Sequence, residues 1–329
     1  MLKGFLWKGV FMIARYGRFG LLVVGSMLLL LLSACNTSMG GANSPSSSGG
    51  TGSSGNNGTS SNKTPMQVLK SSDAAMKQLK TAHFNMDSVT TMNNASTTTA
   101  APHGTTIMLQ DSGDQQFPNQ LTMHLNVGQA TGSPALTLSE VVVGQKVYIQ
   151  SPKGKWFTLD DNILKSTTGN PLAGANVANY NNLLTLAQKE SLSDHGTENM
   201  SGQSLRHITV HFSSNVLRDL LATTGQLNSM SAQQQEALKN TRLENPTLDL
   251  WIDEATSYVH RMVLKFTMSA GTSAIGTAVT TKSSSSPVMS SRTSTDVNTA
   301  IDYSKFNAPV KITAPSNAIS TSNISQIFE

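Results

Sequence analysis

Apolar and polar residues alternate along several stretches of the chain, and a period of two is typical of a strand with one buried face. The stretches with this pattern are 121–127, 141–149, 208–212, 248–252 and 262–268. Residues 151–155 and 253–256 lie next to these stretches and contain the residue types that form turns. The pattern therefore predicts several antiparallel strands, some of them joined as hairpins.

A helix is predicted before the first of these strands. Thr64 can cap it, Pro65 suits its first turn, and Gln67 can complete a capping box. Apolar residues then recur at helical spacing, which predicts an amphipathic helix that ends at about Thr81. Shorter helices are expected at 180–190, 215–221 and 236–240.

The Ser- and Thr-rich stretch 269–299 has no clear period. Its middle, around Pro287, is typical of a loop, whereas its flanks could be solvent-facing strands, so we expect a long hairpin. No repeat and no second linker divides the chain convincingly after residue 63. We therefore expect one α+β domain over residues 64–329.

The N-terminal 34 residues have the layout of a secretory signal. Lys3, Lys8, Arg15 and Arg18 form a basic region without acidic residues, and the apolar run 21–32 follows it. This run has about twelve residues, whereas a spanning helix needs about twenty. We expect a cleaved signal peptide over residues 1–34 rather than a permanent transmembrane helix.

Cys35 is the only cysteine of the chain and directly follows this apolar run. It could be a reactive thiol, a buried structural residue or a modified anchor point, but neither a scaffold that holds a base nor an apolar core is visible around it. The sequence Leu32-Ser33-Ala34-Cys35 resembles the lipobox of bacterial lipoproteins, in which the cysteine receives a diacylglycerol thioether and becomes the new N-terminus. The resemblance implies lipid attachment at Cys35, a partner membrane, and a lipid-anchored protein on the outward face of the cell membrane.

Residues 35–63 are almost wholly Ser, Gly, Asn and Thr, so we expect a disordered linker after the anchor. A flexible chain of this length has an end-to-end distance of about 30 Å. Four of the 23 Lys and Arg lie in the predicted signal, which leaves 19, equal to the 19 Asp and Glu. The mature chain is then neutral, and its charge favours no nucleic-acid partner.

Four segments, taken in order, resemble the lipoproteins of the mycobacterial lipid-carrier group and, more distantly, the periplasmic LolA/LolB-like lipoprotein carriers. They read VLKSSDAAMKQLKTAHFNMD, VYIQSPKGKWFTLD, LDLWIDEATSYVHRMVLKF and IDYSKFNAPVKITAP. The resemblance covers most of residues 65–315. It implies an antiparallel sheet curled into an incomplete barrel, helices over its concave face, and an apolar cavity between the two layers.

The apolar positions of the alternating strands are the candidates for the wall of such a lipid cavity. They are Met123, Leu125, Ile208, Val210, Leu250, Ile252, Met262, Leu264 and Phe266. The methionine thioether adapts to ligands of variable shape, although the same residue types also fill ordinary cores. We therefore expect lipid binding or lipid transport, and the alternative is a protein-interaction or envelope-sensing module without cargo.

The sequence offers little for catalysis, a metal or a cofactor. His207 and His211 are four residues apart, but they lie in a predicted strand, where they would be about 13 Å apart and too distant for one ion. No Gly-x-Ser-x-Gly motif marks a nucleophilic serine. Trp156 and Trp251 are interpreted as packing residues. We expect no enzyme activity, no metal site and no cofactor.

Overall fold

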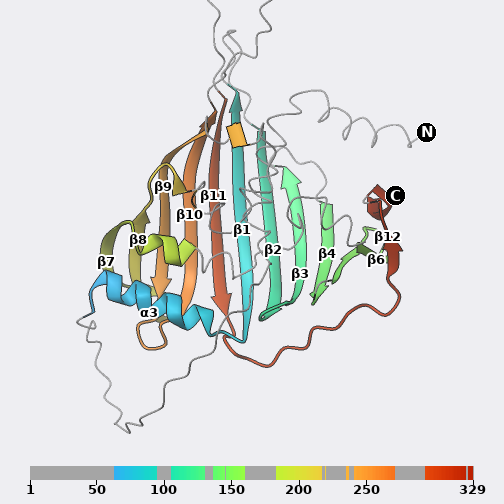
Figure 1. The fold of residues 1–329 in the computed structure, drawn as a ribbon, viewed down its shortest axis with the longest axis horizontal. Helices are drawn as coiled ribbons and strands as arrows, with labels where there is room; N and C mark the ends of the chain where they lie inside the picture. Colours follow the sequence, from blue (N-terminus) through green and yellow to red (C-terminus); the bar gives the residue numbers. More distant parts are fainter. Residues whose placement is uncertain are drawn as a thin grey trace, which may run out of the picture.

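The computed structural model describes residues 63–94, 105–129, 136–144, 146–159, 183–216, 219, 235–236, 241–270, 293–323 and 325–328. Twelve strands of this part form one sheet in the order β12-β6-β5-β4-β3-β2-β1-β11-β10-β9-β8-β7 (Figure 1). The first half of the sheet contains β1 (Thr81–Asn94), β2 (Thr105–Gln116), β3 (Gln120–Gln129), β4 (Leu136–Val143), β5 (Lys146–Gln150) and β6 (Trp156–Leu159). The second half contains β7 (Ser191–Met200), β8 (Gln203–His211), β9 (Thr241–Ile252), β10 (Val259–Ala270) and β11 (Thr293–Ser304), and the short strand β12 (Ile319–Thr321) lies at the opposite edge.

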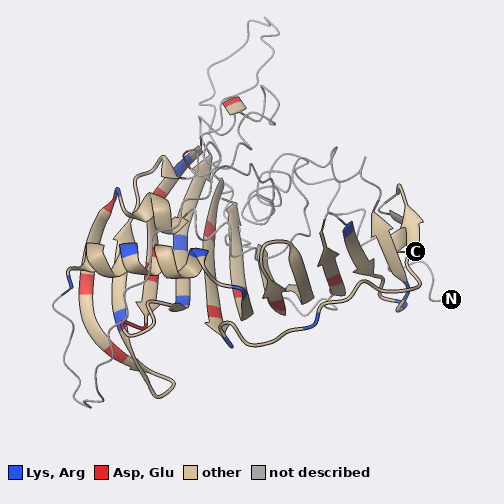
Figure 2. Cartoon of the chain, turned by 60° about the horizontal axis from the view of Figure 1, so that its bottom comes forward, with Lys and Arg blue, Asp and Glu red and all other residues tan. Residues whose placement is uncertain are grey.

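The sheet consists of two antiparallel meanders that meet in its middle. Strands β1 to β6 pair in sequence order, and so do β7 to β11. The pairing of β1 with β11 joins the two halves, and β12 adds to β6 as the one parallel strand. Strands β12 and β7 remain edges, and the sheet curves without closing, as Figures 1 and 2 show. The predicted α+β class and the curled, incomplete barrel are confirmed.

Helix α3 (Pro65–Lys77) begins as the sequence predicted. The Thr64 hydroxyl accepts a hydrogen bond from the Gln67 backbone N–H, and the Gln67 side chain accepts one from the Thr64 N–H. Its apolar side chains point to one face of the sheet, which we call the inner face, where they join the main core cluster. Helix α3 and a second helical turn lie over the β7–β10 half of this face, on the side that the resemblance implied (Figure 1).

The predicted end of this helix at about Thr81 is wrong. The helix ends at Lys77, and Thr81 is the first residue of β1. The Lys80 carbonyl accepts a hydrogen bond from the Phe117 N–H at 2.8 Å, and the Thr81 carbonyl accepts one from the Asn307 N–H at 2.9 Å. Sheet partners distant in the sequence therefore determine where the helix stops.

A second helical turn, residues 183–187, lies within the predicted helix 180–190. The buried carboxylate of Asp73 in α3 connects the two helices, because it accepts hydrogen bonds from Lys77 at 2.8 Å, Gln188 at 2.9 Å and Thr185 at 3.3 Å. Both helices contribute buried apolar residues to the main core cluster. This polar contact thus fixes the layer that covers the second half of the sheet.

Strands β1, β2, β7 and the short β12 were not predicted. In β2, the inner positions Asp111, Gly113 and Gln115 are not apolar, and the edge strand β7 contains few apolar residues. In β1 the alternation of Ala82, Phe84 and Met86 is present in the sequence, but it directly follows the predicted helix and is too short to stand out. The predicted hairpin over 269–299 is confirmed at its flanks, since β10 pairs with β11 as far as Ala270 and Thr293.

Several sequence predictions concern residues outside the described part. These are the signal 1–34, Cys35, the linker as far as residue 62, the middle of the 269–299 hairpin, and most of the predicted helices 215–221 and 236–240. No helix among the described residues is long and apolar enough to cross a membrane. Acidic and basic residues are interspersed over the described strands and α3 rather than gathered on one basic face (Figure 2).

The close contact of β2 and β3 at Gly113 generates a prediction. A Cβ at this position would lie 2.0 Å from the Thr122 backbone oxygen, so a strand would have to move. We expect Gly113→Ala to lower the free energy of unfolding by about 1–3 kcal/mol, measured by denaturant titration.

Gly128 on the neighbouring strand β3 is the matched control, because a Cβ added there would meet no atom within 4 Å. Gly128→Ala should leave stability unchanged or raise it by about 0.4–1 kcal/mol. Equal stability of the two variants would contradict the tight β2–β3 contact.

Candidate functional site

The inner face of the sheet is the first candidate site. Of the nine predicted cavity residues, eight are buried members of the main core cluster, and Leu125 is half-buried and packs against it. The eight are Met123, Ile208, Val210, Leu250, Ile252, Met262, Leu264 and Phe266. The structure thus brings together, on one face of strands β3, β8, β9 and β10, residues that are up to 143 positions apart in the sequence.

A second apolar cluster lies on the same face over β4 to β6. Its buried members are Leu138, Val147, Ile149, Phe157, Leu159 and Ile327, the last from the C-terminal turn α9 (Ser325–Phe328). Leu125 and Val142 pack against both clusters. The inner face is therefore one apolar surface that extends over most of the sheet.

Apolar side chains at the junction of the two clusters are not fully covered. Leu125, Val127 and Val142 are half-buried, and Leu136 is 36% exposed. Val127 and Leu136 are cross-strand neighbours at the same end of β3 and β4. Buried apolar residues thus continue into an accessible apolar rim at this end of the sheet.

Two carboxyl groups lie within this apolar face. Asp111 of β2 stands between Met86 of β1 and Leu125 of β3, and it is 4% exposed. Glu140 of β4 stands between Met123 of β3 and Ile149 of β5, and it is 2% exposed. The two acids occupy neighbouring cross-strand rows, and strand β3 lies between their strands.

The surroundings of these acids favour their uncharged, protonated forms. Burial raises the pKa of Asp111 to about 7, although a hydrogen bond from the Ser112 backbone opposes the shift. Burial, and then the nearby charge of Asp111, raise the pKa of Glu140 well above its ordinary value. Neither Glu140 oxygen has a hydrogen-bond partner in the structure as far as it is described, and neither has Asp111 Oδ1.

Sequence reasoning did not single out either acid. The signal for Glu140 was present, because it has the same parity as Leu138 and Val142, which makes it an acid at an inward position. The alternating pattern placed Val141 and Val143 in one series with Ile149, but these two valines lie on the opposite, outer face. There Val141 packs with Tyr148 and with Ile312 of the C-terminal segment.

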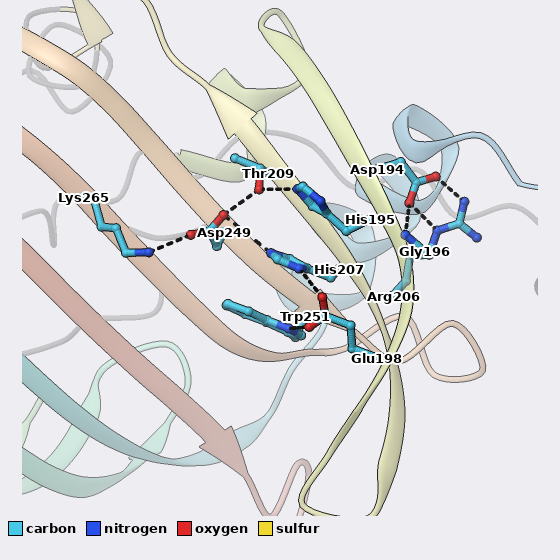
Figure 3. A network of polar contacts seen from close by, with 10 residues as sticks. All are labelled: Asp194, His195, Gly196, Glu198, Arg206, His207, Thr209, Asp249, Trp251 and Lys265. Atoms are coloured by element: carbon cyan, nitrogen blue, oxygen red, sulfur yellow. Dashed lines mark hydrogen bonds and ion pairs between the residues drawn. The ribbon is translucent and has the colours of Figure 1, made fainter.

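The outer face carries a polar and aromatic network over β7 to β10 (Figure 3). His195, His207 and Trp251 stack in succession, with ring centroids 4.4 Å and 4.3 Å apart. The Arg261 guanidinium lies 5.9 Å from the centroid of the Trp251 ring. Trp251 is therefore part of a stacked ladder on the outer face rather than a packing residue of the inner core.

Hydrogen bonds link the members of this ladder. Glu198 accepts from the Trp251 indole N–H at 2.9 Å and lies 2.8 Å from His207 Nδ1, and these two contacts hold the pKa of Glu198 below its ordinary value. Burial alone would raise the pKa of Asp249, but hydrogen bonds from Thr209 and Lys265 outweigh it and lower that pKa. The ladder is held together by groups that satisfy one another.

His207 and His211 lie on β8, as predicted, and each faces a residue of β7. His211 Nε2 lies 2.9 Å from the Ser193 hydroxyl, while His207 contacts Glu198. Among the described residues, no three His, Cys, Asp or Glu form a group that could hold a metal ion. The geometry of this network indicates cross-strand stabilisation.

A shallow depression of about 390 Å³ lies next to this network. Its lining residues are Val89, Thr91, Glu244, Asn245, Lys265, Phe266, Thr267, Asp296, Val297 and Asn298. Asp296 accepts hydrogen bonds from Asn93 and Thr267, and Glu244 accepts one from Ser269. These acids are thus engaged in cross-strand pairs, and the inner face is the stronger candidate site.

The raised pKa of Asp111 predicts a pH dependence of stability. Its carboxyl ionises near pH 4 in the unfolded chain and near pH 7 in the folded one, so its contribution to stability is complete below pH 4 and is lost as the pH rises through 7. We expect the wild type to lose about 2–3 kcal/mol more stability between pH 5 and pH 8 than Asp111→Asn, measured by urea unfolding.

Asp87→Asn, which changes an exposed carboxylate of β1, should follow the wild-type pH profile. The lowered pKa values of Asp194 and Asp249 act below about pH 4 and lie outside this window. The same pH profile for the wild type and Asp111→Asn would show that Asp111 is not buried as described.

No family model matches this chain, and no curated protein matches it. Among solved structures, the chain is similar to LprF from Mycobacterium bovis, with 15% identity, 76% of this chain and 96% of that chain covered, and a TM-score of 0.40. It is similar to the lipoprotein LppX from Mycobacterium tuberculosis, with 13% identity, coverage of 75% and 97%, and a TM-score of 0.37. A LolA superfamily protein from Nitrosomonas europaea has 8% identity, coverage of 74% and 93%, and a TM-score of 0.20.

These structures come from the groups that the sequence resembles, so the predicted resemblance is confirmed. All three TM-scores are below 0.5, and the likeness therefore carries no argument about function. What this protein binds has to be inferred from its own residues.

Proposed function

We propose that this protein is a lipoprotein, anchored to the outward face of the cell membrane through Cys35, that binds or transports lipids on the inner face of its sheet. The observation that carries the proposal is the continuity of this face. The buried apolar residues of the two clusters lie next to the accessible side chains Leu125, Val127 and Leu136, with a few buried polar residues between them. An acyl chain could lie along this rim and enter between the clusters. Its transfer from water would then be favourable by about 0.8 kcal/mol for each buried CH₂ group.

The residue types support a ligand with flexible chains. Met123, Met262 and Met268 are buried on the inner face, and their unbranched thioethers can repack around an acyl chain. The sheet and its helical cover are held together by the packing of apolar side chains. Because the sheet does not close, this packing can loosen slightly, and the two layers can separate enough to admit a chain. The proposed role is binding, without a catalytic step.

The anchor and the binding face have complementary roles in this proposal. The linker of residues 35–63 has a typical span of about 30 Å, which allows the domain to reach lipids at the membrane surface while it remains attached. A lipid that extends from the rim toward the second half of the sheet would then be shielded from water by α3 and residues 183–187. The cell membrane is the source or the destination of the cargo.

A charge placed on the rim tests the binding face. Leu125→Asp introduces a carboxylate on the inner face, whereas Asn126→Asp introduces the same group at the next residue, on the exposed outer face. At pH 8 we expect Leu125→Asp to lower the affinity for a fluorescent fatty acid at least tenfold, because an unpaired charge among apolar groups is strongly unfavourable. Asn126→Asp should bind as the wild type does.

Organic extraction and mass spectrometry of the purified wild type should recover lipid, and circular dichroism should show that both variants are folded. A wild type that yields no lipid and binds no fatty acid would contradict the proposal. A Leu125→Asp variant that unfolds while the wild type carries no lipid would favour the interaction module without cargo.

The anchor is tested separately by Cys35→Ala. Because the thioether forms on the sulfur of Cys35, the variant should lose its lipid and should partition into the aqueous phase or remain as an uncleaved precursor. The measurement is Triton X-114 phase separation together with the intact mass. Unchanged partitioning of a processed protein into the detergent phase would refute lipid attachment at Cys35.

A further inference from the structure

Asp111 and Glu140 are at odds with a face that serves only as an apolar wall. A neutral polar group that is buried without a partner costs about 1–3 kcal/mol, and an ionised one costs more. Leucine or valine in these two positions would continue the apolar rows of Met86–Leu125 and Met123–Ile149. The chain therefore retains two unfavourable groups at the junction of its two apolar clusters.

One buried polar pair of the same face has its partners within the chain. The hydroxyl groups of Ser88 and Thr299, one row from Asp111, lie 2.8 Å apart and satisfy one another. In contrast, three carboxyl oxygens of Asp111 and Glu140 lack a hydrogen-bond partner in the part of the chain that the structure describes. No described residue therefore supplies a hydrogen-bond partner to these three oxygens, and a bound group could do so.

The chemistry of that group follows from the surroundings of the acids. A protonated carboxyl donates one hydrogen bond and accepts others, so it matches a hydroxyl group, which also donates and accepts. An ammonium group would require an ionised carboxylate, and two charges would have to leave water for an apolar site. The apolar residues on both sides of each acid suit the acyl chain next to such a hydroxyl group.

We propose that Asp111 and Glu140 form the head-group site of the inner face and bind the hydroxyl groups of an uncharged, hydroxyl-bearing lipid such as an acylglycerol. This inference rests on the proposed lipid binding and adds the class of lipid. The Asp111–Glu140 site lies beside Leu125, where the two apolar clusters meet, so the head group would be held between them while the chain lies along either cluster. Binding would give the buried oxygens the partners that they lack.

The test compares lipids that share one acyl chain. The probes are 1-monooleoylglycerol, which has two hydroxyl groups, methyl oleate, which has no hydrogen-bond donor, and oleylamine, which is a cation; each competes with a fluorescent fatty acid for the purified full-length protein. We expect the wild type to prefer 1-monooleoylglycerol to methyl oleate at least tenfold. Asp111→Leu/Glu140→Leu should bind the two with equal affinity, with methyl oleate bound at least as tightly as by the wild type.

Glu140→Gln is the matched control, because an amide also donates and accepts hydrogen bonds, and it should keep most of the preference. The leucine substitutions remove unpaired polar groups from an apolar face, so the double variant should have a raised unfolding midpoint. A lower midpoint would show that the acids stabilise the fold and would overturn the inference.

The outcomes separate this inference from the proposed function. Equal wild-type affinity for 1-monooleoylglycerol and methyl oleate would overturn the head-group site and leave lipid binding intact. A preference for oleylamine would overturn the hydroxyl class in favour of a cation. If none of the three lipids competes, lipid binding itself fails.

Discussion

An open sheet with one apolar face is stable only if that face is covered, and this constraint determines the rest of the structure. Because side chains alternate along a strand, each strand places every second residue on the inner face. Helix α3 and residues 183–187 cover the second half of the sheet, and Ile327 of α9 contributes to the cluster over β4 to β6. The contacts of Asp73 with both helices then hold this cover in place. A surface assembled in this way is continuous across both meanders, and its rim near Leu136 reaches solvent.

The outer face is stabilised by different interactions. Planar side chains of four neighbouring strands stack in one line: His195, His207, Trp251 and Arg261. Glu198 connects two of them, His207 and Trp251, by hydrogen bonds. Cross-strand pairs of this kind stabilise a sheet without an apolar cover. The second half of the sheet can therefore leave its outer face to solvent, while the C-terminal segment packs over the outer face of β4 and β5. Because the outer face is either polar or covered by the C-terminal segment, the inner face is the one large apolar surface of the described structure.

The two buried acids show how structure and function are connected on that surface. A carboxyl group in an apolar row weakens the fold, whereas Ser88 and Thr299 show that a buried polar pair can be satisfied nearby. The contrast distinguishes a polar residue that belongs to the core from one that is placed for a ligand. In the proposed head-group site, Asp111 and Glu140 would favour lipid binding but lower the stability of the sheet.

The sequence by itself determined the α+β class, the capped start of α3 at Thr64, the strands with regular alternation and the apolar candidates such as Met123 and Leu264. These features are local, because capping and a period of two depend on residues close together in the chain. The tertiary structure decided the end of α3 at Lys77, the position of β7 at an edge, and the meeting of β1 with β11. It also placed Asp111 and Glu140 in neighbouring rows, since that depends on the register of three strands. A hydrogen-bonded register is set by partners far apart in the sequence, and no local pattern specifies it.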